Sequence, residues 1–324
     1  MHNKPPELIE GKDYYINEQG LWVFTAAYHL ARGYCCGSGC LHCPYTLKSD
    51  KDDLVYSDPI NKMMLTTDQM GNELSLPFPP KRIISLVPSQ TELLFDLGLE
   101  NEIIGVTKFC VHPESKTKSK EKIGGTKKFN LDKIHALQPD LIIGNKEENY
   151  PEGIQALQQN YPVWMSDILT LSDACSMIRE IGRITNRMQS GNDIADKIIH
   201  SFDSFAPLNN QLRAAYFIWR EPYMVAAGVT FIDEMMTRLG VTNVFHHMNR
   251  YPEVNLDTVA DLKPQIIFLS SEPYPFNENH VEEFRELFPS GKIMIVDGQY
   301  FSWYGSRLRM TPGYFATLKE SCSS

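Results

Sequence analysis

Short apolar runs alternate with amphipathic stretches along the chain from about residue 82. The amphipathic stretches repeat apolar residues at three- and four-residue steps, which predicts helices. The apolar runs are continuous, which is typical of strands buried on both faces of a parallel sheet. Such runs are "RIISLV", "IIGV", "DLIIG", "VWMS", "AAYFIW", "QIIFLS" and "KIMIVD". The pattern therefore predicts an α/β fold.

One sixteen-residue phrase occurs twice, as "NLDKIHALQPDLIIGN" from Asn130 and as "NLDTVADLKPQIIFLS" from Asn255. In each copy Asn can cap a helix whose apolar residues recur at three-residue steps. Pro139 or Pro264 then ends that helix, and a buried strand follows. Because the two copies are too far apart for a solenoid period, the repeat predicts a duplicated half-domain and two similar lobes.

The two lobes are expected at residues about 82–170 and about 212–324, after a hairpin around Gly71-Asn72 in "MMLTTDQMGNELSL". Between them, residues about 171–205 carry one apolar stripe without proline, although Gly182 and Gly191 weaken the helical pattern. This stretch predicts one long bridging helix of ~30 residues, ~45 Å in length. The predicted fold class is α/β, with two Rossmann-like lobes joined by a long backbone helix.

Length, net charge and the lengths of the apolar runs exclude some classes of protein. The 324 residues suffice for about two domains. The net charge of −9 argues against nucleic acid as the main partner. No apolar run reaches the roughly 18 residues that a membrane span needs. The start, "MHNKPPELIEGKDYY", has no apolar h-region, so we expect a cytoplasmic protein without a signal peptide.

A cysteine-rich domain is expected at residues 1–48, followed by a polar linker at 49–61. Four of the seven cysteines fall within nine residues of "GYCCGSGCLHCPY". Thiolates this close together favour a shared soft cation, either zinc or an iron–sulfur cluster. The expected metal ligands are Cys35, Cys36, Cys40 and Cys43, and redox or structural thiols are the alternative.

Ligands of open α/β sheets bind beyond the carboxyl ends of the strands, so the loops after each predicted strand supply the candidate ligand-binding residues. These loops are rich in aromatic and charged side chains, which suit a large planar ligand. Packing of the lobe interface is the alternative role for each aromatic residue. The candidates are Phe109, His112, Lys146, Tyr150, Trp219, Arg220, Tyr223, Glu272, Tyr274, Trp303, Tyr304 and Arg307.

The phrases "RIISLVPSQTELLFDLGL" and "EIIGVTKFCVHP", the repeated phrase and the bridging segment together resemble a known family. Residues about 62–324 are similar to the helical-backbone (class III) substrate-binding proteins of ABC transporters, especially the vitamin B12-binding branch. The resemblance implies that a corrinoid (cobalamin), haem or iron siderophore binds between the lobes and is delivered to an ABC permease. The N-terminal segment resembles a small, uncharacterised, cysteine-rich bacterial domain that has the same "CCGSGC" and "HCPY" elements.

The resemblance also implies roles for single residues. In "FSWYGSRL", Trp303 matches a ligand-contacting Trp, whereas Ser302 stands where an Asp is typical of the vitamin B12-binding branch. The docking acids that meet arginines on the permease correspond to Asp132 and Asp257. Stabilisation of a helix dipole is the alternative role for both acids.

Three functions stay open. The first is a cytoplasmic binding protein for a corrinoid or another metal chelate. The second is a cytoplasmic enzyme or redox module that processes such a ligand through the N-terminal cysteines. The third is a transport component whose export signal was lost or lies upstream of the assigned start. Because the sequence has no Ser-His-Asp arrangement, P-loop or zincin motif, a binding protein is favoured over an enzyme.

Overall fold

The computed structural model describes residues 8–17, 20–32, 40–42, 63–208 and 212–323. The chain divides into two compact units, residues 1–66 with 73–78 and residues 67–72 with 79–324. The described part of the first unit contains two β-hairpins and a short helix. Its elements are β1 (Tyr14–Ile16), β2 (Trp22–Phe24), α1 (Ala26–Arg32), β3 (Met63–Thr67) and β4 (Glu73–Pro77).

The hairpin predicted around Gly71 is confirmed, because β3 pairs with β4. Gly71 takes a φ of 83°, which a residue without a Cβ adopts at little cost. One oxygen of Asp68 accepts from the backbone N–H groups of Met70 and Asn72 at 2.9 and 2.8 Å. The turn is therefore closed by its own side chains.

The first lobe is a five-stranded parallel sheet with the strand order β7-β6-β5-β8-β9. Ile83, Ile84 and Leu141 on its central strands are fully buried, as their continuous apolar runs predict. The strands are β5 (Ile83–Ser85), β6 (Ile103–Val106), β7 (Glu121–Lys122), β8 (Leu141–Asn145) and β9 (Val163–Ser166). The helices are α2 (Pro88–Asp96), α3 (Glu114–Thr117), α4 (Leu131–Leu137) and α5 (Pro151–Gln158).

The second lobe is a mixed sheet in which β12, β13 and β14 run parallel to β10 and only β11 is antiparallel. Phe217 of β10 packs edge-to-face on Phe284 of α10 in its core. The strands are β10 (Arg213–Trp219), β11 (Met224–Val225), β12 (Thr242–Asn243), β13 (Ile266–Ser270) and β14 (Lys292–Val296). The helices are α8 (Phe231–Leu239), α9 (Leu256–Asp261), α10 (Glu278–Leu287), α11 (Gln299–Ser302), the 3-10 helix η1 (Ser306–Met310) and α12 (Thr311–Ser323).

The repeated phrase forms the same unit in both lobes. Its copies are α4 with β8 and α9 with β13, and they lie in different sheets. β8 pairs with β5, the first strand of its lobe, and β13 pairs with β10, the first strand of the other lobe. Asn130 accepts a hydrogen bond from Lys133 N, and Asn255 accepts one from Asp257 N. The predicted duplication and the predicted fold class are thus confirmed.

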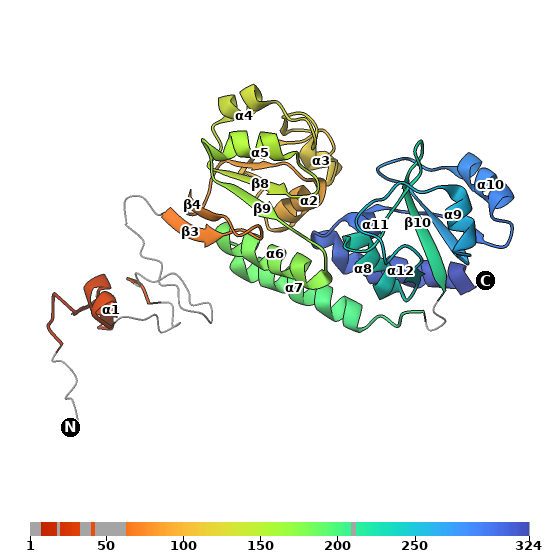
Figure 1. Ribbon diagram of the computed structural model, residues 1–324. Helices are drawn as coiled ribbons and strands as arrows, with labels where there is room; N and C mark the ends of the chain where they lie inside the picture. Colours follow the sequence, from red (N-terminus) through yellow and green to blue (C-terminus); the bar gives the residue numbers. More distant parts are fainter. Residues whose placement is uncertain (1–7, 18–19, 33–39, 43–62, 209–211, 324) are drawn as a thin grey trace. The chain divides into compact units, whose positions relative to one another are not determined.

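The bridging segment corrects one prediction. A single continuous helix over 171–205 is wrong, because the chain turns back at Thr185–Arg187, between α6 (Leu171–Ile184) and α7 (Met188–Asp203). The two helices lie side by side (Figure 1). A Cβ at Gly182 would stand 3.0 Å from Gly191 Cα, so the absence of side chains here allows the close approach. Gly182 and Gly191, which weaken the helical pattern, therefore form the close contact between α6 and α7.

Near the C-terminus, η1 contacts helix α2 of the first lobe. The bidentate pair between Arg307 of η1 and Glu92 of α2 has N–O distances of 2.9 and 2.8 Å. A Cβ at Gly305 would meet the carbonyl oxygen of Ser89 at 2.3 Å. The two lobes are thus joined by the α6–α7 segment and by these η1 contacts. No helix in the described ranges has both the length and the apolar character that crossing a membrane requires.

Candidate ligand-binding site

The loops after strands of both lobes meet in one group of polar side chains, here called the inter-lobe cluster. Because nearly all strands in each sheet run parallel, the loops that follow them gather at one edge of that sheet. The cluster contains Glu147 and Glu148 after β8, Arg250 and Tyr251 after β12, Glu272 after β13 and Tyr304 after α11.

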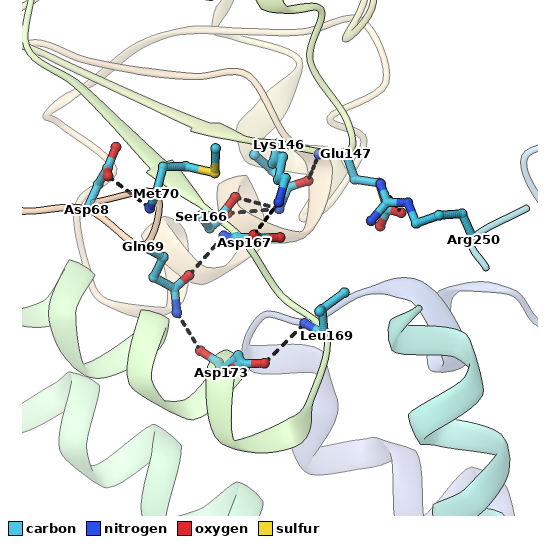
Figure 2. Close-up of polar contacts among 11 residues, drawn as sticks. Asp68, Gln69, Met70, Lys146, Glu147, Ser166, Asp167, Leu169, Asp173 and Arg250 are labelled. Carbon is cyan, nitrogen blue, oxygen red and sulfur yellow. Dashed lines mark hydrogen bonds and ion pairs between the residues drawn. The ribbon is translucent and has the colours of Figure 1, made fainter. Parts of the chain in front are cut away.

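Glu147 and Arg250 join the lobes directly, with 3.0 Å between Arg250 Nη2 and Glu147 Oε1. Figure 2 shows Arg250 reaching Glu147 from a separate segment of the chain. Burial raises the pKa of Glu147, and the charge of Arg250 and a hydrogen bond with Tyr251 oppose that shift. Lys127 Nζ also contacts the carbonyl oxygen of Glu147. Arg250 and Lys127 therefore both place positive charge near the Glu147 carboxyl group and oppose the rise in its pKa that burial causes.

Glu148 is half-buried in the same cluster. Burial raises its pKa to about 7; the charge of Lys127 opposes this shift, and the charges of Glu272 and Glu147 add to it. A carboxyl group with this pKa is about half protonated at neutral pH, so it can both donate and accept hydrogen bonds. Glu148 can therefore act as a donor or as an acceptor in the cluster.

Glu272 holds the loop that contains Trp303. Its Oε1 accepts from Ser302 Oγ and from Trp303 Nε1, each at 2.9 Å. Burial raises the pKa of Glu272, whereas these two hydrogen bonds lower it. Ser302 thus supplies a hydroxyl donor to a glutamate that lies 30 positions away in the chain.

Trp303 lies between side chains of both lobes. Its ring meets His112 of the first lobe edge-to-face at a centroid distance of 5.5 Å, and the Arg307 guanidinium lies 4.9 Å from its centroid. Trp303 is only 7% exposed and Tyr304 only 4%. The structure therefore brings His112, Trp303, Tyr304 and Arg307 together, and the two aromatic residues pack within the lobe interface.

Four predicted residues form a separate cluster within the second lobe. Trp219 and Tyr274 meet edge-to-face at 5.8 Å, and Arg220 Nη2 stands 3.0 Å from Glu283 Oε2 on α10. Tyr223 donates to Glu283 at 2.6 Å. Trp219 is 40% exposed, so this cluster offers an accessible aromatic face, but no contact of these four residues joins the lobes within the described parts of the chain.

The remaining candidates of the first lobe are also dispersed. Phe109 is half exposed, and Lys108 Nζ lies 4.9 Å from its ring centroid. Lys146 forms an ion pair with Asp167 (Figure 2), in which Lys146 Nζ lies 2.6 Å from Asp167 Oδ2. Tyr150 packs on Phe129 at 4.7 Å. Tyr150 thus contributes to a different surface from Glu147, although only three positions separate them.

The predicted docking acids occupy equivalent places in the two lobes. Asp132 and Asp257 are exposed in the first turns of α4 and α9. Beside the first acid lies an open depression of about 620 Å³. It is lined by Lys128, Phe129, Asn130, Leu131, Asp132 and Tyr150.

Comparison with known proteins now identifies the family. Residues 83–287 match the family described as periplasmic binding protein. This chain belongs to the periplasmic binding protein family. The vitamin B12-binding protein of Vibrio vulnificus (strain CMCP6) is 30% identical over 206 residues, which cover 62% of this chain and 74% of that protein.

Solved structures of this fold agree with that assignment. The periplasmic vitamin B12-binding protein of Vibrio cholerae superposes with a TM-score of 0.65 at 22% identity, over 76% of this chain and 100% of its own. The periplasmic heme-binding protein of Roseiflexus sp. RS-1 gives 0.67 at 20% identity, over 75% and 99%. At these identities the structures establish the fold. Residues 3–49 match a separate family of unknown function.

The predicted metal site of this family member lies mostly outside the described residues. Cys35, Cys36 and Cys43 fall there, and Cys40 is half-buried at the edge of the described segment 40–42. Within the described ranges, no group of three or more His, Cys, Asp or Glu side chains is arranged to hold a metal ion. The cysteine cluster stays a prediction.

Arg250 and Tyr251 of the cluster, and Lys127 beside it, were not found by prediction from sequence. Arg250 and Tyr251 follow β12, which has only two residues and no apolar run to mark it. Lys127 follows β7, another two-residue strand. Comparison of the two lobes could have revealed these residues. Each lobe has a two-residue strand, β7 or β12, and the missed residues lie in the loops that follow these strands.

Proposed function

We propose that the chain binds a corrinoid or a closely related metal chelate between its two lobes. The observation that carries this proposal is the inter-lobe cluster, in which Glu147 and Arg250 from opposite lobes meet at 3.0 Å. Family membership supports it, as do the relatives named vitamin B12-binding proteins. Aromatic rings with a few charged groups suit a large conjugated ligand, and His112, Trp303 and Tyr304 supply such rings at the lobe interface.

Native mass spectrometry of protein purified anaerobically from its host would test this proposal. We expect the intact protein to carry a corrinoid, and the emptied protein to bind cobalamin or cobinamide in a titration with one ligand per chain. Hemin and a ferric hydroxamate siderophore serve as competing ligands. Failure of every one of these ligands to bind would overturn the proposal. Chemical turnover of a bound corrinoid under reducing conditions would instead favour an enzyme.

The second part of the proposal concerns an ABC permease as partner. The exposed carboxylates of Asp132 and Asp257 at equivalent places in two similar lobes suit a partner with two-fold symmetry. The charge reversals Asp132→Arg and Asp257→Arg should abolish association with permease-containing vesicles while ligand affinity stays constant. Loss of ligand affinity in both variants would contradict a docking role. Cell fractionation would decide whether the chain is cytoplasmic or meets the permease on the outer side.

The third part concerns the N-terminal cysteines, for which we propose a zinc ion or an iron–sulfur cluster. Their crowding in "GYCCGSGCLHCPY" supports it. Metal content of the anaerobically prepared intact protein should fall in a Cys40→Ser, Cys43→Ser double variant and stay unchanged in Cys322→Ala. Equal metal in all three proteins, or none in any, would refute the proposal. Visible absorption would distinguish an iron–sulfur cluster from zinc.

A further inference from the structure

Carboxyl groups outnumber the cations that can neutralise them in the inter-lobe cluster. Glu147 has Arg250 as its ion-pair partner, and Arg307 is taken by Glu92. Among the described residues, neither Glu148 nor Glu272 forms an ion pair. Two acidic groups from opposite lobes therefore lie close enough for the charge of Glu272 to add to the rise in the pKa of Glu148 that burial causes, and neither has an ion-pair partner among the described residues.

Unused hydrogen-bonding atoms point to a ligand there. Ser302 Oγ and Trp303 Nε1 both donate to Glu272 Oε1, and Glu272 Oε2 accepts a hydrogen bond from no described residue. The Tyr304 hydroxyl is buried beside Ser89, Glu148 and Glu147, yet it makes no hydrogen bond of normal geometry within the described chain. A buried polar atom without a partner is costly, so a bound molecule that pairs with it would offset that cost.

We propose that Glu148, Glu272 and Tyr304 select a macrocyclic ligand whose rim carries uncharged amide groups and discriminate against one whose rim carries carboxylates. This inference rests on the proposed function. An amide N–H can donate to Glu148 or to Glu272 Oε2, and an amide carbonyl can accept from Tyr304. A carboxylate has no N–H to donate and would be repelled by the charged forms of these two glutamates, which have no ion-pair partner among the described residues.

The alternative is that the two glutamates only hold the lobe interface together. Glu272 does have that role, since it fixes Trp303 and Ser302. Glu148, however, makes no hydrogen bond through its carboxyl group with any described residue. Burial beside two other glutamates costs free energy, and within the described chain only the charge of Lys127 opposes that cost. A purely structural role therefore fails to explain Glu148.

The test uses the intact protein and pairs of macrocycles that differ only at the rim. One pair is a corrinoid with its side chains as amides and the same corrinoid after hydrolysis to carboxylates. The other is hemin and the bisamide made from its two propionates. We expect each amide form to bind roughly tenfold more tightly or better than its carboxylate form, as measured by calorimetry. Glu148→Gln and Glu272→Gln should reduce that ratio, and Glu286→Gln on α10 should leave it unchanged.

The comparison within each pair needs only the wild-type protein, so a variant that fails to fold leaves the test intact. Carboxylate forms that bind as tightly as amide forms, or more tightly, would overturn the selection by glutamates while the proposed function stands. Equal ratios in wild type, Glu148→Gln and Glu272→Gln would also overturn it, because the discrimination would then arise elsewhere. If no macrocycle binds, the proposed function fails as well.

Discussion

Glu148 shows how burial sets the charge of a single residue in this protein. Its pKa is raised to about 7, first by burial and further by Glu272 and Glu147, while Lys127 opposes the shift. Below pH ~4.5 the carboxyl is protonated in the folded and in the unfolded chain. Between that value and about 7 the unfolded chain releases the proton and the folded chain retains it. Rising pH therefore lowers stability across this window.

The substitution Glu148→Gln should remove this loss. Glutamine keeps the size of the side chain without its charge, so the variant should melt at a higher temperature than wild type above pH ~7, by about 2 °C or more. The difference should shrink towards pH ~4.5. Thermal unfolding followed by circular dichroism across this range measures it, with exposed Glu286→Gln as control. Parallel curves for wild type and Glu148→Gln would contradict the raised pKa.

Two neighbouring ion pairs between η1 and α2 permit a matched comparison. Arg307 and Glu92 form a bidentate pair with side chains only 10% and 14% exposed, whereas Arg309 and Asp96 are 40% and 31% exposed. Glu92→Gln leaves a buried guanidinium without its charge partner and should cost ~3 kcal/mol or more in unfolding free energy. Asp96→Asn should cost less than ~1 kcal/mol. Urea denaturation measures both, and equal losses would mean that burial is not the deciding factor.

Some site residues could be predicted from the sequence and others could not. His112 and Trp303 were found because they follow recognisable strands, and they do meet. Arg250 was missed because a two-residue strand precedes it. The partner of Arg307 is Glu92, 215 positions earlier in the chain, and this pairing depends on the tertiary fold. Residue types at strand ends are thus readable from sequence, whereas partners across the lobes are not.

At the scale of elements, the repeated phrase was predictable and the bridging helices were not. Asn caps and prolines are local signals, so each copy specifies its own boundaries. The stretch 171–205 shows one continuous apolar stripe, which a straight helix and a helix pair satisfy equally well. The pair forms because Asn186 adopts a φ of 58° and Gly182 approaches Gly191. Of these, only the glycines leave a trace in the sequence.

The helix pair should therefore be sensitive to a single methyl group. In Gly182→Ala the new Cβ would stand 3.0 Å from Gly191 Cα and 3.0 Å from the carbonyl oxygen of Arg187. Both neighbours are backbone and would have to shift by a few tenths of an ångström, at an expected cost of ~1–3 kcal/mol. Gly313→Ala in α12 is the control, because no atom lies within 4 Å of its added Cβ. It should be neutral or stabilising by up to ~1 kcal/mol. Equal denaturation midpoints would show that the α6–α7 contact tolerates a methyl group.

At the scale of the whole second unit, the two lobes are similar, but they contribute different elements to the interface between them. The duplicated halves place their strand ends at the same edge of each sheet, and that common plan was readable from the repeat. The contacts between the halves are not duplicated. η1 comes only from the second lobe and binds α2 of the first through Arg307. The lobes are consequently connected by η1 and by the α6–α7 segment, and the Glu147–Arg250 pair is a further polar contact between them.

Removal of that pair should loosen the facing loops without unfolding the protein. Arg250 is 41% exposed and Glu147 22%, so the pair contributes at most ~1 kcal/mol, equivalent to an approximately fivefold change in local opening. In Arg250→Gln, hydrogen–deuterium exchange should accelerate by up to about that factor in peptides that cover Glu147 and Arg250. Exchange in the central strands β8 and β13 should stay constant. Arg238→Gln, which removes a pair with Glu234 inside α8, is the control and should leave both loops unaffected. If exchange at Glu147 is the same in wild type and Arg250→Gln, the ion pair does not restrain the facing loops.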